Sequence, residues 1–229
     1  MVQGGTLMAK AIVLLSGGLD STTTMAKALD DGMEVHALGF RYGQRHEREM
    51  VSANEVCEHY GVKLTVIEID LSSFSSALTD PDVKVPHDRE GNLDEEIPST
   101  YVPARNIIFL SIAAGLCESI CADRIYIGAN VVDYSGYPDC RPEFFEAYQN
   151  MLEKGTKAGV EGNPIKIVTP ILNMSKADIV KLAKELDAPL HLTWSCYEGG
   201  EKACGHCDSC ILRLRGFKEA GFEDEIGYE

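Results

Sequence analysis

The sequence predicts an α/β fold, a Rossmann-like parallel sheet with helices on both faces, followed by a small C-terminal four-cysteine motif. Three observations predict it. Short apolar runs alternate with segments of helical spacing, a glycine-rich turn follows the first apolar run, and four of the eight cysteines fall within residues 196–210. The length of 229 residues, 45% of them hydrophobic, suits one domain with a small appendage.

The first third of the chain alternates between strand-like and helix-like segments. Residues 11–15 (AIVLL) are a short apolar run ended by glycines, which is typical of a buried strand. Residues 20–31 have helical spacing and stop at Gly32. A strand at 34–40, a polar helix at 45–60 and a strand at 62–69 follow. This β-α-β-α-β order predicts a parallel sheet with right-handed crossovers.

Residues 79–99 interrupt the alternation, because they contain three prolines and many charges. We expect them to form a long loop, which is either a lid or a disordered segment. The elements expected after it are a helix at 105–121, a strand at 124–128, a loop at 130–141, a helix at 142–158, a strand at 166–171 and helices at 175–186 and 211–220. Pro142 suits a first helical turn and Ser175 an N-cap. We therefore divide the chain into a tail (1–8), a nucleotide-binding domain (9–190) and a cysteine-containing segment with a closing helix (191–229).

The formal net charge of −15 opposes binding to nucleic acid backbones. The sequence has no apolar run of membrane-spanning length and no secretory signal, so we expect a cytoplasmic protein without a membrane partner. In the cytosol, eight cysteines indicate thiols or a metal rather than disulfides. Cys117 and Cys121 lie four residues apart in an apolar helix, and we expect both in the core.

The glycine-rich turn at residues 16–21 lies between the first strand and the first helix. Glycine lets the backbone approach a phosphate closely, and a helix start offers free N–H groups to an anion. Asp20 is itself an anion, so it is interpreted as a Mg²⁺ ligand or as an acceptor that orients loop N–H groups. The turn has neither the Walker nor the dinucleotide pattern. It resembles the SGGxDS loop of ATP pyrophosphatases, which implies ATP contacts from Leu15, Ser16, Gly17, Gly18, Leu19, Asp20, Ser21 and Thr22.

Two further features bear on the phosphates and on a metal. Lys176 is at the start of a predicted helix, where its positive charge is unfavourable next to the positive end of the helix dipole. The same resemblance implies that Lys176 reaches the phosphates. An ordinary surface lysine is the alternative. Cys196, Cys204, Cys207 and Cys210 have the spacing C-x7-C-x2-C-x2-C, which suits one structural, tetrahedral Zn²⁺. An iron–sulfur cluster and unmetallated thiols are the alternatives.

Five segments together resemble the 7-cyano-7-deazaguanine synthase family, a queuosine-pathway family within the PP-loop ATP pyrophosphatases. They are LSGGLDSTT (15–23), FRYGQRHERE (40–49), YVPARN (101–106), DYSGYPDCRPEF (133–144) and SCYEGGEKACGHCDSC (195–210). The resemblance spans about residues 11–217. It implies an adenine nucleotide alpha hydrolase-like fold, a homodimer and ATP with Mg²⁺ as co-substrate. It also implies a reaction in which 7-carboxy-7-deazaguanine and ammonia give the nitrile through an adenylated acid and an amide.

The resemblance also implies roles outside the turn. Lys176 and Arg105, together with Asp20 of the turn, are the expected catalytic residues, and Arg45 is expected to contact phosphate. For Arg105, an ordinary surface arginine at a helix start is the alternative. His46 is either a proton carrier or a structural histidine. The pocket for the deazaguanine is expected to use Tyr42, Gln44, Asp133, Tyr134, Ser135, Tyr137, Asp139 and Arg141. A nucleophilic role for Cys140 has no obvious partner in the sequence.

Two other classes of protein compete with this interpretation. A tRNA-thiolating or tRNA-lysidine-forming ligase would use the same turn, but the charge of −15 argues against an RNA substrate. A zinc-stabilised nucleotide-binding module without catalysis would not need Asp20 or Lys176, and both are present.

Overall fold

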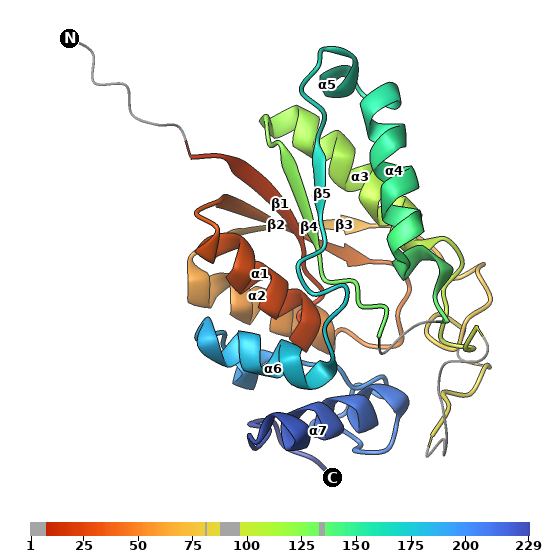
Figure 1. The fold of residues 1–229 in the computed structure, drawn as a ribbon. Coiled ribbons are helices and arrows are strands. Elements are labelled where there is room, and N and C mark those ends of the chain that lie inside the picture. The colour runs from red at the N-terminus through yellow and green to blue at the C-terminus, as the bar shows by residue number, and fades with distance from the viewer. Residues whose placement is uncertain (1–7, 81, 88–96, 133–135) are drawn as a thin grey trace.

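Five parallel strands form one sheet in the order β3-β2-β1-β4-β5 in the computed structural model, which describes residues 8–80, 82–87, 97–132 and 136–229 (Figure 1). The strands are β1 (Lys10–Leu14), β2 (Glu34–Arg41), β3 (Lys63–Glu68), β4 (Arg124–Ile127) and β5 (Lys166–Val168). All five lie where the apolar runs predicted them, although β5 is shorter than expected. The predicted fold class is confirmed.

Helices cover both faces of this sheet (Figure 1). On β1, Ile12 and Leu14 pack against α3 (Arg105–Ile120) and α4 (Pro142–Gly155). The alternate residues Ala11 and Val13 pack against α1 (Leu19–Asp30) and α2 (Arg48–Tyr60). Because successive strand side chains point to opposite faces, a strand buried on both faces is apolar throughout. This is why AIVLL is a continuous apolar run.

Several predicted helix ends are confirmed. Pro142 lies in the first turn of α4, and the Ser175 hydroxyl accepts a hydrogen bond from the Asp178 N–H at the start of α6 (Lys176–Glu185). Two starts differ from the prediction: α2 begins at Arg48 rather than at residue 45, and α7 (Asp208–Ala220) begins three residues early. The remaining short helices are η1 (Pro138–Cys140), α5 (Lys157–Val160) and η2 (Leu190–Leu192).

The expectation that both helical cysteines lie in the core is half right. Cys117 is buried, but Cys121 is exposed, because α3 ends at Ile120 and Cys121 follows it in a left-handed conformation with φ of 56°. None of the eight cysteines, all within the described ranges, forms a disulfide.

Helices α6 and α7 extend the layer that α1 and α2 form (Figure 1). Leu19 of α1, Ile179 of α6 and Phe217 of α7 share one apolar cluster. This packing brings the cysteine segment between α6 and α7 next to the glycine-rich turn. Among the residues that the structure describes, no helix has the length and apolar character needed to cross a bilayer.

Candidate active site

A cavity of about 260 Å³ lies at the carboxyl ends of β1, β2 and β4. Leu15 and Ser16 line it after β1, Tyr42 after β2, and Gly128 after β4. Ligands of open parallel sheets bind at the carboxyl ends of the strands, at the point where the strand order changes direction. In this sheet that point lies between β1 and β4. Three polar segments, at residues 16–21, 41–46 and 130–141, contribute residues to the cavity.

The glycine-rich turn forms one wall of this cavity. Gly18 is the N-cap of α1, and no side chain caps this end of the helix. The first N–H groups of the helix therefore have no capping acceptor, and the residues that carry them line the cavity. The hydroxyls of Ser16 and Ser21 lie 3.0 Å apart and hydrogen-bond to the turn's own backbone. Gly17 has φ of 85°, and a Cβ there would overlap the Glu49 carbonyl and lie 2.5 Å from the Ala53 nitrogen.

Lys176 and Asp20 form an ion pair inside the cavity. The Lys176 Nζ lies 2.8 Å from each carboxylate oxygen of Asp20, although 156 residues separate them in sequence. Lys176 is only 6% exposed, so it is no ordinary surface lysine. Its aliphatic stem packs against Gly216 of α7, where a Cβ would overlap the Lys176 Cγ. Helix α7 therefore directs the ammonium towards the turn.

The other predicted residues after β2 also lie at the cavity. Tyr42, Gln44 and Arg105 line it, and Arg105 donates to the Tyr42 hydroxyl at 3.4 Å. The Gln44 side chain accepts from the Tyr42 N–H and donates to the Phe40 carbonyl. Burial raises the pKa of Tyr42. Arg105 is thus the second cation at the cavity that the sequence predicted.

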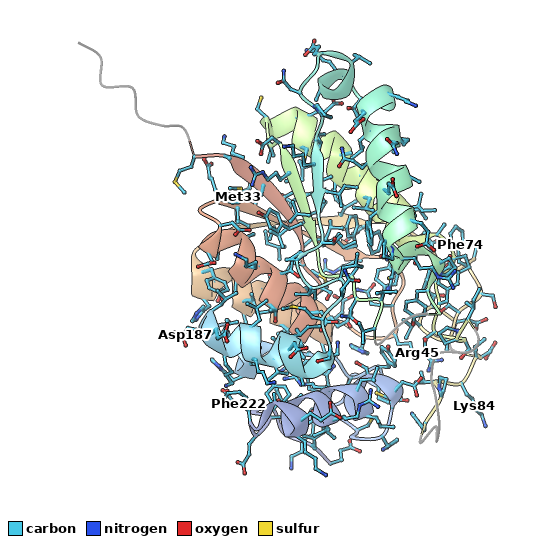
Figure 2. The ribbon with its side chains drawn as sticks, viewed as in Figure 1. Met33, Arg45, Phe74, Lys84, Asp187 and Phe222 are labelled. Carbon is cyan, nitrogen blue, oxygen red and sulfur yellow. The ribbon has the colours of Figure 1, made fainter. Side chains whose placement is uncertain are left out.

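Arg45 has a different set of partners from the one expected. Its guanidinium donates to the carbonyls of Ala77 (2.7 Å), Asp80 (2.9 Å) and Val83. Figure 2 labels Arg45, which lies between β2 and α2, and Lys84, which directly follows the loop residues that Arg45 contacts. Arg45 lines the cavity but holds residues 77–83 beside it, so its contact with phosphate stays a prediction.

The described part of the predicted lid, residues 79–80, 82–87 and 97–99, also contacts the cysteine segment. His87 pairs with Cys207 in an isolated bridge, and its Nε2 lies 2.8 Å from Glu198 Oε1. These contacts join the loop to the cysteine segment. Movement as a lid stays a prediction.

The predicted deazaguanine pocket is described only in part. Asp133, Tyr134 and Ser135 lie outside the described residues. Tyr137 lines the cavity. The remaining two, Asp139 and Arg141, do not line it. Asp139 is buried and accepts a hydrogen bond from the Asn106 N–H at the start of α3. Arg141 is exposed at the start of α4.

The two uncertain candidates differ in their surroundings. Burial raises the pKa of the Cys140 thiol to about 12, which disfavours the thiolate that a nucleophile needs. The His46 Nε2 donates to the Cys196 carbonyl at 3.1 Å, and its Nδ1 is buried without a partner among the described residues. These contacts favour the structural interpretation of His46.

Glu49, in the first turn of α2, is a cavity residue that the sequence analysis missed. Burial raises its pKa to about 7, and the charge of Arg105 opposes this rise. A helix-start glutamate is usually solvated. The only sequence signal was its place at the end of the FRYGQRHERE segment.

The four predicted cysteines gather in one place. The sulfurs of Cys196, Cys204, Cys207 and Cys210 all lie within 4.8 Å of one another, and those of Cys204 and Cys210 are 3.9 Å apart. Four thiolates at about 2.3 Å from a tetrahedral ion would be separated by about 3.8 Å. The donor set and its spacing therefore fit a metal site.

The cysteine segment also contacts the glycine-rich turn. The backbone N–H of Trp194 donates to the Gly17 carbonyl at 2.9 Å, and the indole N–H of Trp194 donates to the Cys196 carbonyl at 3.0 Å. A metal held by Cys196 would therefore stabilise one wall of the cavity. Sequence spacing alone cannot reveal such a contact.

Comparison with known proteins gives the family. Residues 10–221 match the family described as Queuosine biosynthesis protein QueC. A protein named 7-cyano-7-deazaguanine synthase from Acetivibrio thermocellus is 58% identical over 96% of this chain and 98% of its own length. One of the same name from Thermoplasma acidophilum is 56% identical over 96% of this chain and 92% of its own.

A solved structure supports the fold alone. NMN synthetase from Francisella tularensis has a TM-score of 0.50 at 16% identity and covers 95% of this chain and 79% of its own. The full-length match to the family and the two close relatives decide membership: the chain belongs to the QueC family of queuosine biosynthesis proteins.

Proposed function

We propose that the chain is an ATP-dependent carbon–nitrogen ligase that converts 7-carboxy-7-deazaguanine and ammonia into 7-cyano-7-deazaguanine. Relatives at 56% and 58% identity carry the name of this activity. The observation that carries the proposal is the buried Lys176–Asp20 pair beside the glycine-rich turn. It puts a cation, a carboxylate and free helix N–H groups in one cavity.

Each group has a role in moving AMP onto an oxygen. The N–H groups at the start of α1 and the Lys176 ammonium would bind the β- and γ-phosphates. Arg105 would neutralise charge on the substrate carboxylate or on the α-phosphate. Asp20 would hold a Mg²⁺ that arrives with ATP, and that ion would offset the negative charge of the phosphates.

The reaction has two halves, each of which uses one ATP. In the first half, a carboxylate oxygen attacks the α-phosphorus and pyrophosphate leaves; ammonia then attacks the carbonyl carbon, AMP leaves and the nitrogen releases a proton. In the second half, the amide oxygen attacks a second α-phosphorus. Loss of AMP and of the two nitrogen-bound protons then leaves the nitrile. Adenylylation makes both oxygens good leaving groups.

We propose that Zn²⁺ is the metal of the cysteine cluster. Four cysteine ligands leave no coordination position for substrate, which indicates a structural ion. Backbone N–H groups of Cys204 and Glu198 donate to the Cys196 sulfur at 3.4 Å, which suits a thiolate. Residues 191–229 would then close the site formed by the nucleotide-binding domain at residues 9–190.

The other proposals rest on the family and on the composition. We propose a cytoplasmic homodimer that takes ammonia from solution or from another protein. The net charge of −15 supports a small-molecule substrate over a nucleic acid.

The test is release of AMP and pyrophosphate from ATP in the presence of 7-carboxy-7-deazaguanine and ammonium. Release that requires both compounds, with the nitrile as final product, supports the proposal. Release triggered by tRNA would favour the RNA ligases, and absence of release would favour a binding module. Formation of ADP in place of AMP would overturn the proposal.

A further inference from the structure

We propose that Glu49 is the base that takes protons from the reacting nitrogen in both halves of the reaction. The proposal rests on the proposed function, and it adds a catalytic residue to it. It is carried by the position of the carboxylate, by its lack of a partner, and by the absence of another acceptor at the cavity among the described residues.

The first turn of α2 packs directly against the glycine-rich turn, and this contact positions Glu49. Gly17 has no Cβ, and any side chain there would overlap the Glu49 backbone. Glu49 also lines the cavity together with Ser16 and Asp20. Glu49 therefore belongs to the part of the cavity lining next to the glycine-rich turn, near the place that the adenylated carbon would take.

The Glu49 carboxylate is not engaged elsewhere. Within the described ranges it makes no hydrogen bond or ion pair. Its oxygens are not fully enclosed by protein atoms, so a substrate can reach them. Glu47, two residues earlier, is 65% exposed and pairs with Arg41 at 2.9 Å. Asp20 is paired with Lys176. Glu49 is thus the cavity carboxylate that is available to a substrate.

The chemistry needs an acceptor at this position. The nitrogen loses a proton when ammonia displaces AMP, and it loses two more when the amide becomes a nitrile. The reacting nitrogen occupies the same place in both steps, because the same carbon carries AMP each time. One carboxylate beside that carbon therefore serves both halves.

The other titratable groups at the cavity are poor acceptors. Those facing it are Arg45, Arg105, Lys176, Arg213, Tyr42, Tyr137, Tyr197, Cys140, His46 and Asp20. The arginines and the lysine are cations, and burial raises the pKa of Tyr42, Tyr137 and Cys140, which keeps them protonated. His46 uses Nε2 on a backbone carbonyl, and its Nδ1 is buried.

The environment of Glu49 suits a base at neutral pH. Burial raises its pKa to about 7, while Arg105 lowers it. A base is most effective when its pKa is near the working pH, because it is then both ionised and basic enough to hold a proton.

The test separates adenylylation from proton removal in the variant Glu49→Gln. Exchange of labelled pyrophosphate into ATP, driven by 7-carboxy-7-deazaguanine without ammonium, reports adenylylation, which needs no base. We expect exchange within about threefold of wild type, with amide and nitrile formation each reduced by about 100-fold or more. The matched control Glu47→Gln, at the N-cap of the same helix, should keep both activities.

Other outcomes overturn the proposal in distinguishable ways. If Glu49→Gln loses exchange and amide formation equally, Glu49 binds substrate and is not the base. If neither falls, Glu49 has no part in the reaction. If the wild type shows no exchange dependent on this acid, the proposed function itself fails.

Discussion

The raised pKa of Glu49 has a consequence for stability that can be measured without substrate. The folded protein holds a proton on Glu49 up to about pH 7, whereas the unfolded chain releases it at the ordinary pKa of 4.5. Between these two values the folded state binds more protons than the unfolded state. The free energy of unfolding therefore falls as the pH rises through this window, and the loss levels off above the folded-state pKa.

The size of the effect follows from the two pKa values. Their separation corresponds to about 3 kcal/mol at high pH, and about 2 kcal/mol of this develops between about pH 5.5 and about pH 8. Glu49→Gln removes the ionisation. The variant should therefore gain about 2 kcal/mol relative to wild type over this range, and it should be the more stable protein at about pH 8.

The assay is urea unfolding at several pH values, followed by the fluorescence of Trp194, which is the only tryptophan and is 3% exposed. Glu47→Gln is the control, because Glu47 is exposed. The difference in unfolding free energy between this variant and wild type should not rise with pH in this way. Parallel pH dependence of wild type and Glu49→Gln would refute the raised pKa. It would also remove the electrostatic support for Glu49 as a base.

Three further predictions concern the cavity and the metal. Asp20→Asn should reduce pyrophosphate release by at least about 100-fold with circular dichroism unchanged; an unchanged rate would exclude Asp20 from the reaction. Gly216→Ala should reduce turnover by about tenfold because the new Cβ displaces Lys176, while Gly115→Ala, with nothing within 4 Å of its Cβ, should keep the rate. Equal rates in both would mean that α7 does not position the lysine. Cys207→Ser should lose bound zinc by metal analysis and lower the melting temperature; iron in the wild type, or no metal, would contradict the zinc assignment.

The fold could be predicted because its elements have strong local signals. The apolar run of β1 is buried on both faces, and the Ser175 cap lies where its spacing with Asp178 places it. The cysteine cluster was also predictable, since close spacing limits how far its thiols can separate. Helix starts were less certain, because the polar residues before α2 continue the helical pattern without belonging to the helix.

The site was predictable in its sequence motifs but not in its long-range contacts. The pairing of Asp20 with Lys176 joins residues from opposite ends of the chain, and only the packing of α6 beside α1 produces it. Arg45 suggested a phosphate contact, yet three loop carbonyls bind its guanidinium. The close packing of the Glu49 backbone against the glycine-rich turn depends on the absence of a side chain at Gly17. Such effects arise from tertiary packing, which spacing does not encode.

The two carboxylates that line the cavity differ in their ion pairing. Asp20 lies 2.8 Å from the ammonium of Lys176, which is only 6% exposed, and removing one partner of a buried ion pair costs several kcal/mol. Asp20 therefore serves as an ion-pair partner of a buried cation. Glu49 feels the charge of Arg105 but is in no ion pair within the described ranges, so gaining or losing a proton there breaks no such pair. Carboxylates in different environments can thus divide the work of one site, with Asp20 orienting charge and Glu49 accepting protons.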